Sequence, residues 1–555
     1  MIKFICNGDH FLNIPGIPIA YWVSDGFTDL FSYKKVSDYA EPRHGMSTGN
    51  NDLCLKLWPE VKYSDICFDA ESKDDFDKKG RIYAPYKKGG EYRLWYGNND
   101  YVIAYSAPAR RRMEALSGYR SSSTSFFFKP SINWSDVSSS NFGVRTSPKG
   151  FAFDGRGASM FCDERHRLLL LGLLASKVTT YILNVLNPTL TFNINNVAAI
   201  PVLPVETNNI EGLVNECVDL SKEDWDQFEF SWDFRTNPLT GGDNMGRLIS
   251  DKYSEWERKC QDRFEHLKRN EEEINRVFIN AYGLQEELSP EVEDKDITVR
   301  LADKERDIKS LVSYLVGLAM GRYSLDVPGL AYAGGEWDDS KYLSYQPDDD
   351  GIIPIYSGIG MEDGLTTTLI KLIKLIYGED TYRQNIDFIA DALGKNNNES
   401  SEETLNRYLN DGFYADHLKI YQKRPIYWLF TSGKKAGFKC LIYMHRYNED
   451  TLARINAKYF LPESTRKKNE LDELNGRISH AEGRDKLRLE KKRQNLAAAY
   501  NEAIEYGQIL DHMANQYISI DLDDGVKVNY AKFQGVEIVT DGGSKVKKDL
   551  LAPLK

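Results

Sequence analysis

The pattern of apolar residues changes near residue 205, and this change limits the fold more than any other feature of the chain. Residues 30–160 are rich in Tyr, Phe, Trp, Ser and Gly, and they contain turn signals at residues 88–90 and 97–99, so they predict strands and loops. Beyond residue 205, apolar residues recur mainly at helical spacing. These helical segments are residues 245–282, 300–320, 365–377, 382–394, 402–411 and 465–516. Strands followed by helices predict the α+β class.

Three local patterns refine this outline. Residues 166–186 predict one helix, which Pro188 ends. Residues 425–447 predict two strands joined by a turn. Residues 465–516 predict an antiparallel helix pair, because Gly483 is a poor residue for a helix interior.

Charge is distributed unevenly along the chain. The whole chain has 71 basic and 83 acidic residues. Residues 1–205 hold 24 basic and 20 acidic residues, a net charge of +4, which leaves 47 and 63, or -16, for residues 206–555. Within 105–156 there are eight basic residues and three acidic ones. A surface that binds nucleic-acid phosphates is therefore expected in the first third.

Several kinds of site are not indicated by any motif. The seven cysteines include no Cys-x-x-Cys pair, which predicts a reducing cytoplasmic location and no structural zinc. No signal peptide and no apolar run of membrane-spanning length is visible. Residues 348–350 are three aspartates without a following Glu-x-Lys, so an acidic loop is favoured over a nuclease metal site. We therefore expect no metal site.

Two short segments imitate parts of a methyltransferase. Asn187-Pro188 resembles the start of the loop that grips a flipped base, but the second proline and the aromatic residue are missing, so a helix stop is favoured. Residues 352–360 resemble a strand followed by a glycine turn, but Pro354 interrupts the strand and a third glycine is missing, so a surface loop is favoured. We expect no catalytic and no cofactor-binding residue in this chain.

Four polar segments of the first third have the residue types that DNA recognition uses. Arg, Asn and hydroxyl side chains contact base edges and phosphates, and glycines allow the backbone to approach closely. The alternative is that these segments are ordinary turns and solvated loops. The candidate residues are Arg43, Ser47, Thr48, Asn50 and Asn51 in loop 41–51; Tyr96, Asn98 and Asn99 in 92–99; Arg110, Arg111, Arg112, Arg120 and Lys129 in 108–129; and Ser139, Ser140, Arg145 and Lys149 in 138–150.

Nine short stretches along the chain form a recognisable set. They are residues 14–24 (IPGIPIAYWVS), 42–51 (PRHGMSTGNN), 95–99 (WYGNN), 138–145 (SSSNFGVR), 200–204 (IPVLP), 329–338 (GLAYAGGEWD), 422–428 (QKRPIYW), 443–446 (YMHR) and 521–530 (DLDDGVKVNY). In this order they resemble the PglX family of adenine-specific methyltransferases from BREX phage-exclusion systems. Residues 200–204, which follow the helical segment, also resemble the end of the recognition domains of type I restriction specificity subunits.

The resemblance implies the C-terminal half of such an enzyme, without its catalytic half. The intact family members use S-adenosylmethionine for adenine N6 methylation, and this part would choose the target. The expected organisation is a β-rich recognition domain like that of the specificity subunits, followed by a mainly helical region with short strands. The expected borders are 1–28 for a linker, 29–210 for the recognition domain, 211–345 for a helical domain, 346–460 for an α/β domain, and 461–555 for a helical hairpin with short strands.

The partners implied are double-stranded DNA and a methyltransferase domain, in the same chain or in another one. Other BREX proteins and phage inhibitors that mimic DNA are further partners to expect, whereas a membrane is not. Two alternative functions stay open at this point. The acidic region 206–555 could be a scaffold that docks other defence components, or the chain could be a restriction nuclease subunit. By itself the chain is expected neither to bind S-adenosylmethionine nor to methylate DNA.

Overall fold

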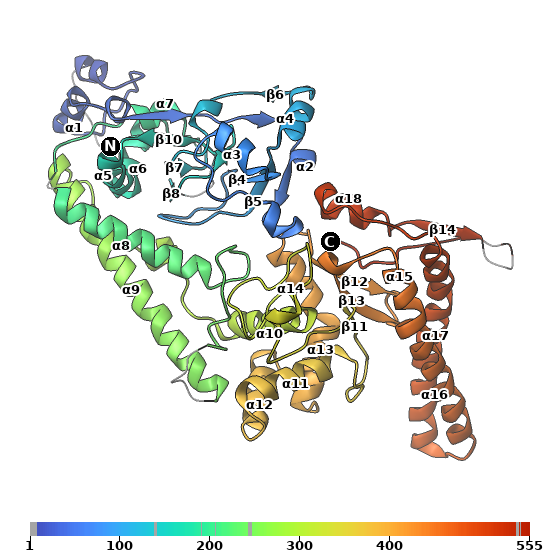
Figure 1. Ribbon diagram of the computed structural model, residues 1–555. Helices are drawn as coiled ribbons and strands as arrows, with labels where there is room; N and C mark the ends of the chain where they lie inside the picture. The colour runs from blue at the N-terminus through green and yellow to red at the C-terminus, as the bar shows by residue number, and fades with distance from the viewer. Residues whose placement is uncertain are drawn as a thin grey trace. The chain divides into compact units, whose positions relative to one another are not determined.

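The computed structural model describes residues 8–137, 141–189, 191–205, 207–241, 247–539, 543 and 545–554. Within these residues the chain forms two compact units (Figure 1). The first unit comprises the described residues of Met1–Trp58, Ser64–Trp232 and Glu257–Ala302. The second comprises those of Pro59–Tyr63, Asp233–Trp256 and Asp303–Lys555. Small sheets dominate the start of the chain and helices the rest, which confirms the predicted α+β class.

The strands of the first unit form three sheets. One four-stranded sheet has the order β1-β10-β7-β8, another has the order β3-β5-β4-β9, and β2 pairs with β6. All of these pairs are antiparallel except β4 with β9. The strands are β1 (Ala40–Arg43), β2 (Ser47–Thr48), β3 (Leu55–Leu57), β4 (Tyr83–Lys87), β5 (Tyr101–Ala104), β6 (Tyr119–Arg120), β7 (Ser131–Trp134), β8 (Val144–Ser147), β9 (Ala152–Phe153) and β10 (Ser159–Cys162).

The helices of the first unit lie before, between and after these strands. They are α1 (Asp25–Asp29), α2 (Asn51–Cys54), α3 (Lys73–Lys79), α4 (Ala107–Glu114), α5 (Glu164–Ala175), α6 (Lys177–Leu186), α7 (Ile194–Ala198), α8 (Thr207–Asp226) and α9 (Ile249–Tyr282). The sequence did not predict α8, whereas α9 lies within residues 245–282, which were predicted to be helical. The first residues of α9, up to Trp256, belong to the second unit and the rest to the first.

The segment predicted as one helix over 166–186 is two helices. Ser176 has extended backbone angles between α5 and α6, and its hydroxyl donates a hydrogen bond to the Leu173 carbonyl at 2.7 Å. Apolar spacing continues across the break, so periodicity alone did not reveal it. Among the described residues no single helix has the length and apolar composition to cross a membrane. Helices α5 and α6 taken together have that length and composition, but they are bent by 71° relative to each other.

The main core of the first unit joins the sheets to the helices. Leu171 of α5, Ile210 of α8 and Phe278 of α9 belong to the same buried cluster as Trp134 of β7. This cluster crosses the domain border predicted near residue 210. It also includes Ile14 and other residues of the segment predicted to be a linker. A second buried cluster surrounds the β3-β5-β4-β9 sheet and contains many aromatic rings.

The second unit is mainly helical around a small sheet of order β11-β13-β12. Its helices are α10 (Lys304–Met320), α11 (Leu365–Tyr377), α12 (Tyr382–Ala392), α13 (Ser401–Asp411), α14 (Phe413–Ile420), α15 (Thr451–Arg454), α16 (Leu461–Ser479), α17 (Gly483–Ala514) and α18 (Val526–Ala531). Its strands are β11 (Ile352–Pro354), β12 (Tyr427–Thr431), β13 (Lys439–Tyr443), β14 (Val536–Val539) and β15 (Lys545–Lys548).

Two predictions about the second unit are confirmed and one is wrong. Strands β12 and β13 pair as predicted, and α16 and α17 form the predicted helix pair, with Gly483 at a φ of 58°. Residues 352–354 were predicted to lie in a surface loop, but they form the buried strand β11. Pro354 is compatible with this strand because β11 lies at the edge of its sheet, where a missing N–H donor leaves no neighbouring strand unpaired.

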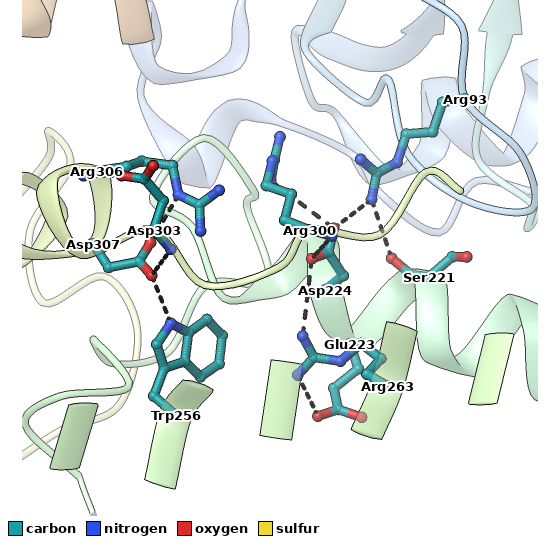
Figure 2. Close-up of polar contacts among 10 residues, drawn as sticks. All are labelled: Arg93, Ser221, Glu223, Asp224, Trp256, Arg263, Arg300, Asp303, Arg306 and Asp307. Atoms are coloured by element: carbon teal, nitrogen blue, oxygen red, sulfur yellow. Dashed lines mark hydrogen bonds and ion pairs between the residues drawn. The ribbon is translucent and has the colours of Figure 1, made fainter. Parts of the chain in front are cut away.

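The start of α10 shows how hydrogen bonds fix a helix end in this unit (Figure 2). The Asp303 side chain accepts a hydrogen bond from the Arg306 backbone N–H at 2.7 Å and so caps the helix. The Trp256 indole donates to the Asp307 carboxylate at 2.9 Å. The first part of α9 is thereby attached to α10.

Candidate nucleic-acid interface

Two of the predicted DNA-contacting segments, residues 41–51 and 108–129, lie side by side in the first unit. Strand β2 of loop 41–51 pairs antiparallel with β6, so that Ser47 is opposite Arg120 and Thr48 is opposite Tyr119. At Gly49, which has a φ of 77°, an added Cβ would lie 3.0 Å from the Leu116 Cβ and from the Tyr119 backbone nitrogen. Glycine at this position therefore lets the two segments pack closely.

Three arginines of the second segment are exposed beside this pairing. Residues 107–114 form helix α4 rather than the mobile loop predicted for 108–129. Arg111 and Arg112 on this helix and Arg120 on β6 are exposed, and none of the three forms a hydrogen bond or ion pair with any residue that the structure describes. Arg110 differs, because it makes two 2.8 Å hydrogen bonds to the Asp77 carboxylate. Arg110 therefore anchors α4, and the other three are available to a ligand.

Phe126 holds two more cations near the same segments. The Arg43 guanidinium lies 4.9 Å from the centre of the Phe126 ring, and the Lys129 ammonium also lies 4.9 Å from it. Both basic side chains are exposed, and Arg43 also pairs with Glu41. We call the exposed side chains of Arg43, Ser47, Asn50, Asn51, Arg111, Arg112, Arg120 and Lys129 the β2–β6 surface.

The two asparagines of this surface use their side-chain oxygens inside the protein. Asn50 caps α2 by accepting a hydrogen bond from the Leu53 backbone N–H at 3.2 Å. Asn51 accepts a hydrogen bond from the buried Thr48 hydroxyl at 2.6 Å. Bidentate recognition of adenine needs both the amide oxygen and the amide nitrogen. In this arrangement each asparagine presents only its NH₂ donor, so the predicted bidentate contact needs a rearranged side chain.

Each candidate of 92–99 and 138–150 that the structure describes is buried or bonded to another residue of the protein. Tyr96, Asn99 and Arg145 are buried, which corrects their predicted place on exposed loops. Asn98 donates a hydrogen bond to the Glu91 carbonyl at 2.9 Å. Lys149 is exposed but forms an ion pair with Glu71 at 2.6 Å.

The remaining two candidates, Ser139 and Ser140, lie outside the described residues. The turn at 95–99 and strand β8 are instead parts of the interior. The backbone of Trp95 pairs with that of Arg145 in a parallel bridge.

Buried charges surround this turn. The Lys87 ammonium donates hydrogen bonds to the Gly97 carbonyl at 3.0 Å and to the Asn99 side chain, and burial holds the pKa of Lys87 well below its usual value. Burial also lowers the pKa of Arg145 to about 10 and raises that of Asp100 to about 6. The polar groups of 95–99 thus form hydrogen bonds with buried charges. The sequence alone does not distinguish this role from base recognition.

A second buried network attaches the turn to the helices of the first unit (Figure 2). Asp224 of α8 accepts a hydrogen bond from Arg93 at 2.8 Å and another from the Arg300 backbone N–H at 3.0 Å. The Arg263 and Arg300 guanidinium groups lie 3.8 and 3.9 Å from the same carboxylate. The sequence reasoning missed Arg93 and Asp224, because single charged residues more than a hundred positions apart give no pattern.

A cavity of about 280 Å³ lies beside Trp95 in the same unit. Glu271 of α9 lines it, is 5% exposed, and accepts a hydrogen bond from the Trp95 indole at 2.7 Å. Burial raises the pKa of Glu271 to about 8, and the nearby Asp296 and Glu272 carboxylates add to this shift. None of the predicted DNA-contacting residues lines the cavity, so it is separate from the β2–β6 surface.

The aspartates at 348–350 make their contacts within the second unit. Their carboxylates come within 4.8 Å of one another. However, Asp350 pairs with Lys458 at 2.8 Å, and Asp348 accepts a hydrogen bond from the Gly351 backbone N–H at 2.7 Å. Through these contacts the carboxylates of Asp348 and Asp350 stabilise the loop in which they lie.

Comparison with known proteins gives two long matches. The adenine-specific methyltransferase PglX of Lacticaseibacillus casei (strain Zhang) is 39% identical over 545 residues, which are 95% of this chain and 45% of that protein. The adenine-specific methyltransferase BrxX of Escherichia coli O9:H4 (strain HS) is 35% identical over 554 residues, with 94% and 45% covered. No protein-family model matches the chain.

The chain therefore spans less than half the length of each of these curated relatives. The matched span includes residues of both units. The chain is homologous, along nearly its whole length, to a part of the adenine-specific methyltransferases PglX and BrxX.

Proposed function

We propose that this chain selects the DNA target for an adenine-specific methyltransferase that acts in BREX-type defence against phages. The homology to PglX and BrxX supports the link to adenine methylation. In this proposal the catalytic part, in the same protein or in another one, binds S-adenosylmethionine and transfers its methyl group to N6 of adenine. The first unit of this chain binds duplex DNA and positions it.

The observation that supports DNA binding most directly is the β2–β6 pairing. It brings the exposed Arg120 next to loop 41–51. Arg111, Arg112 and Arg120 are exposed without an acidic partner among the described residues, so their charge is available to phosphates. Hydroxyl and amide groups of Ser47, Asn50 and Asn51 stand beside these charges, as base recognition requires.

Removing the charge of the β2–β6 surface should weaken DNA binding in a salt-dependent way. In the variant R111A/R112A/R120A, affinity for random-sequence duplex DNA should fall on the order of 10–100-fold at low salt, because up to three phosphate contacts are lost. The plot of log Kobs against log salt should become shallower by up to about 2.7, or about 0.9 for each contact. Fluorescence anisotropy titrations at several salt concentrations measure both quantities.

A matched variant controls for net charge. Arg165, Arg258 and Lys295 are exposed in the first unit, and each pairs with a neighbouring acid. The variant R165A/R258A/K295A loses the same three charges and should bind DNA nearly as the parent does. If both variants bind alike, DNA binding does not use the β2–β6 surface, and the proposal loses its main support.

The substitution N50D separates the structural role of Asn50 from base recognition. Aspartate also caps helices well, so the stability of α2 should be retained. The change removes the amide NH₂ donor and adds negative charge, which should cost roughly 1–3 kcal/mol at the preferred site, the range for one specific base contact. The preferred site is first selected from a random duplex library. Equal loss on preferred and on random DNA would contradict a role in base recognition.

A further inference from the structure

The first three turns of α17 are strongly basic although the surrounding half of the chain is acidic. Residues 484–493 contain six basic residues and two acidic ones, a net charge of +4, within residues 206–555 that together carry -16. The basic residues are Arg484, Lys486, Arg488, Lys491, Lys492 and Arg493. This segment lies in the helix pair α16–α17 of the second unit (Figure 1). The positive charge is therefore concentrated in one part of one helix.

Most of these charges have no acidic partner. All six side chains are exposed. Lys492 pairs with Glu470 of α16 at 2.9 Å, and Arg488 has the looser partner Asp485 at 3.8 Å. The other four form no hydrogen bond or ion pair with the part of the chain that the structure describes. Their charge is available to a ligand.

Three of the basic residues follow one side of the helix. Arg484, Arg488 and Lys491 are spaced i, i+4 and i+7, which places them in a row about 10 Å long. We call these three side chains the α17 basic row. The buried Leu489 is not part of the row and packs toward the protein. The row therefore follows an exposed side of the helix.

Helix stability does not explain this arrangement. Cations near the start of a helix are opposed by the helix dipole, and each such position costs typically 0.3–1 kcal/mol. The pairs Arg484–Arg488 and Arg488–Lys492 place like charges four residues apart, which also destabilises a helix. A bound polyanion would relieve both effects. Locally unfavourable residues of this kind are typical of functional positions.

We propose that the α17 basic row contacts the sugar–phosphate backbone of duplex DNA without regard to sequence. The second unit then adds binding energy, while base recognition remains with the first unit. The assignment of the polyanion as DNA rests on the proposed function. The composition favours DNA over a protein partner, because half of the basic residues in the segment are lysines. Lysine is depleted in protein–protein interfaces, whereas it commonly contacts phosphates.

The variant R484Q/R488Q/K491Q tests the row in the full chain. The three side chains are exposed, and glutamine is a good helix former, so the helix content by circular dichroism should be unchanged. The salt plot on random-sequence duplex DNA should become shallower by up to about 2.7. The control R383Q/K419Q/K434Q removes three exposed charges from elsewhere in the second unit and should leave the plot unchanged. Equal binding by the two variants would overturn the proposal.

Comparison with R111A/R112A/R120A distinguishes this proposal from the proposed function. If only the first-unit variant loses affinity, the α17 proposal fails and DNA recognition by the first unit stands. If only the α17 variant loses affinity, the α17 proposal stands and the β2–β6 surface is excluded. If both lose affinity, both proposals are supported. If neither does, both are wrong.

Chemical footprinting of the parent protein gives a readout that needs no variant. Lys491 should react more slowly with an acetylating reagent when duplex DNA is present, whereas Lys434 should react at the same rate. Mass spectrometry measures the modification at each lysine. Unchanged reactivity of Lys491 in DNA-saturated protein would contradict the contact, including the case in which the row binds an acidic protein instead.

Discussion

Replacing Asp224 with alanine is expected to destabilise the first unit by about 3–5 kcal/mol. Asp224 is 1% exposed, and its carboxylate is approached by the guanidinium groups of Arg93, Arg263 and Arg300. Without it, the side chains of Arg93 and Arg263 remain buried with less compensating negative charge, and the Arg300 backbone N–H loses its acceptor. Leaving a buried charge uncompensated costs far more than losing an exposed ion pair.

Urea unfolding measures the loss of stability in D224A, and hydrogen exchange of the folded protein shows which elements are affected. Faster exchange should appear in α8 and in the turn at 95–99, because Asp224 connects the helix to Arg93. The control D262A removes an exposed acid that pairs with Arg258 four residues earlier on α9, and it should cost no more than about 0.5 kcal/mol. A D224A protein as stable as D262A would show that the network does not stabilise the unit.

Replacing Glu271 with glutamine is expected to stabilise the first unit at alkaline pH. Burial raises the pKa of Glu271 to about 8 from the usual value of 4.5. Between these two values the unfolded chain has released the proton while the folded chain still holds it. The unfolded state therefore binds fewer protons, and stability falls as pH rises from about 4.5 to about 8. Above the folded-state pKa this loss is complete.

Glutamine is uncharged at every pH, so it removes this loss while its side-chain oxygen can still accept the Trp95 indole hydrogen bond. The variant E271Q should therefore match the parent near pH 4.5 and exceed its free energy of unfolding on the order of 3–5 kcal/mol at pH 8 or above. Urea unfolding at both pH values measures the difference. The control E273Q, at a half-exposed glutamate on the same helix, should show no such difference in stability between the two pH values. A stability difference between E271Q and the parent that does not change with pH would contradict the explanation.

The sequence determined the features that depend on neighbouring residues. Periodic apolar spacing gave the positions of α11, α12 and α13 and the helix pair α16–α17, and turn residues gave the β12–β13 pair. The missing glycine turn and base-gripping loop likewise gave the expectation that the chain has no cofactor site. Each of these signals lies within a short window of sequence, where local propensity and apolar period decide the structure.

Tertiary structure decided which polar side chains are exposed. The sequence assigned Arg112 and Arg145 to the same DNA surface, yet Arg112 is exposed on α4 whereas Arg145 is 1% exposed. Residue type does not distinguish them, because burial of a charge depends on partners that are distant in sequence, as Asp100 is from Arg145. The β2–β6 pairing likewise joins segments about 70 residues apart, since β2 residues Ser47–Thr48 meet β6 residues Tyr119–Arg120 only when the chain has folded.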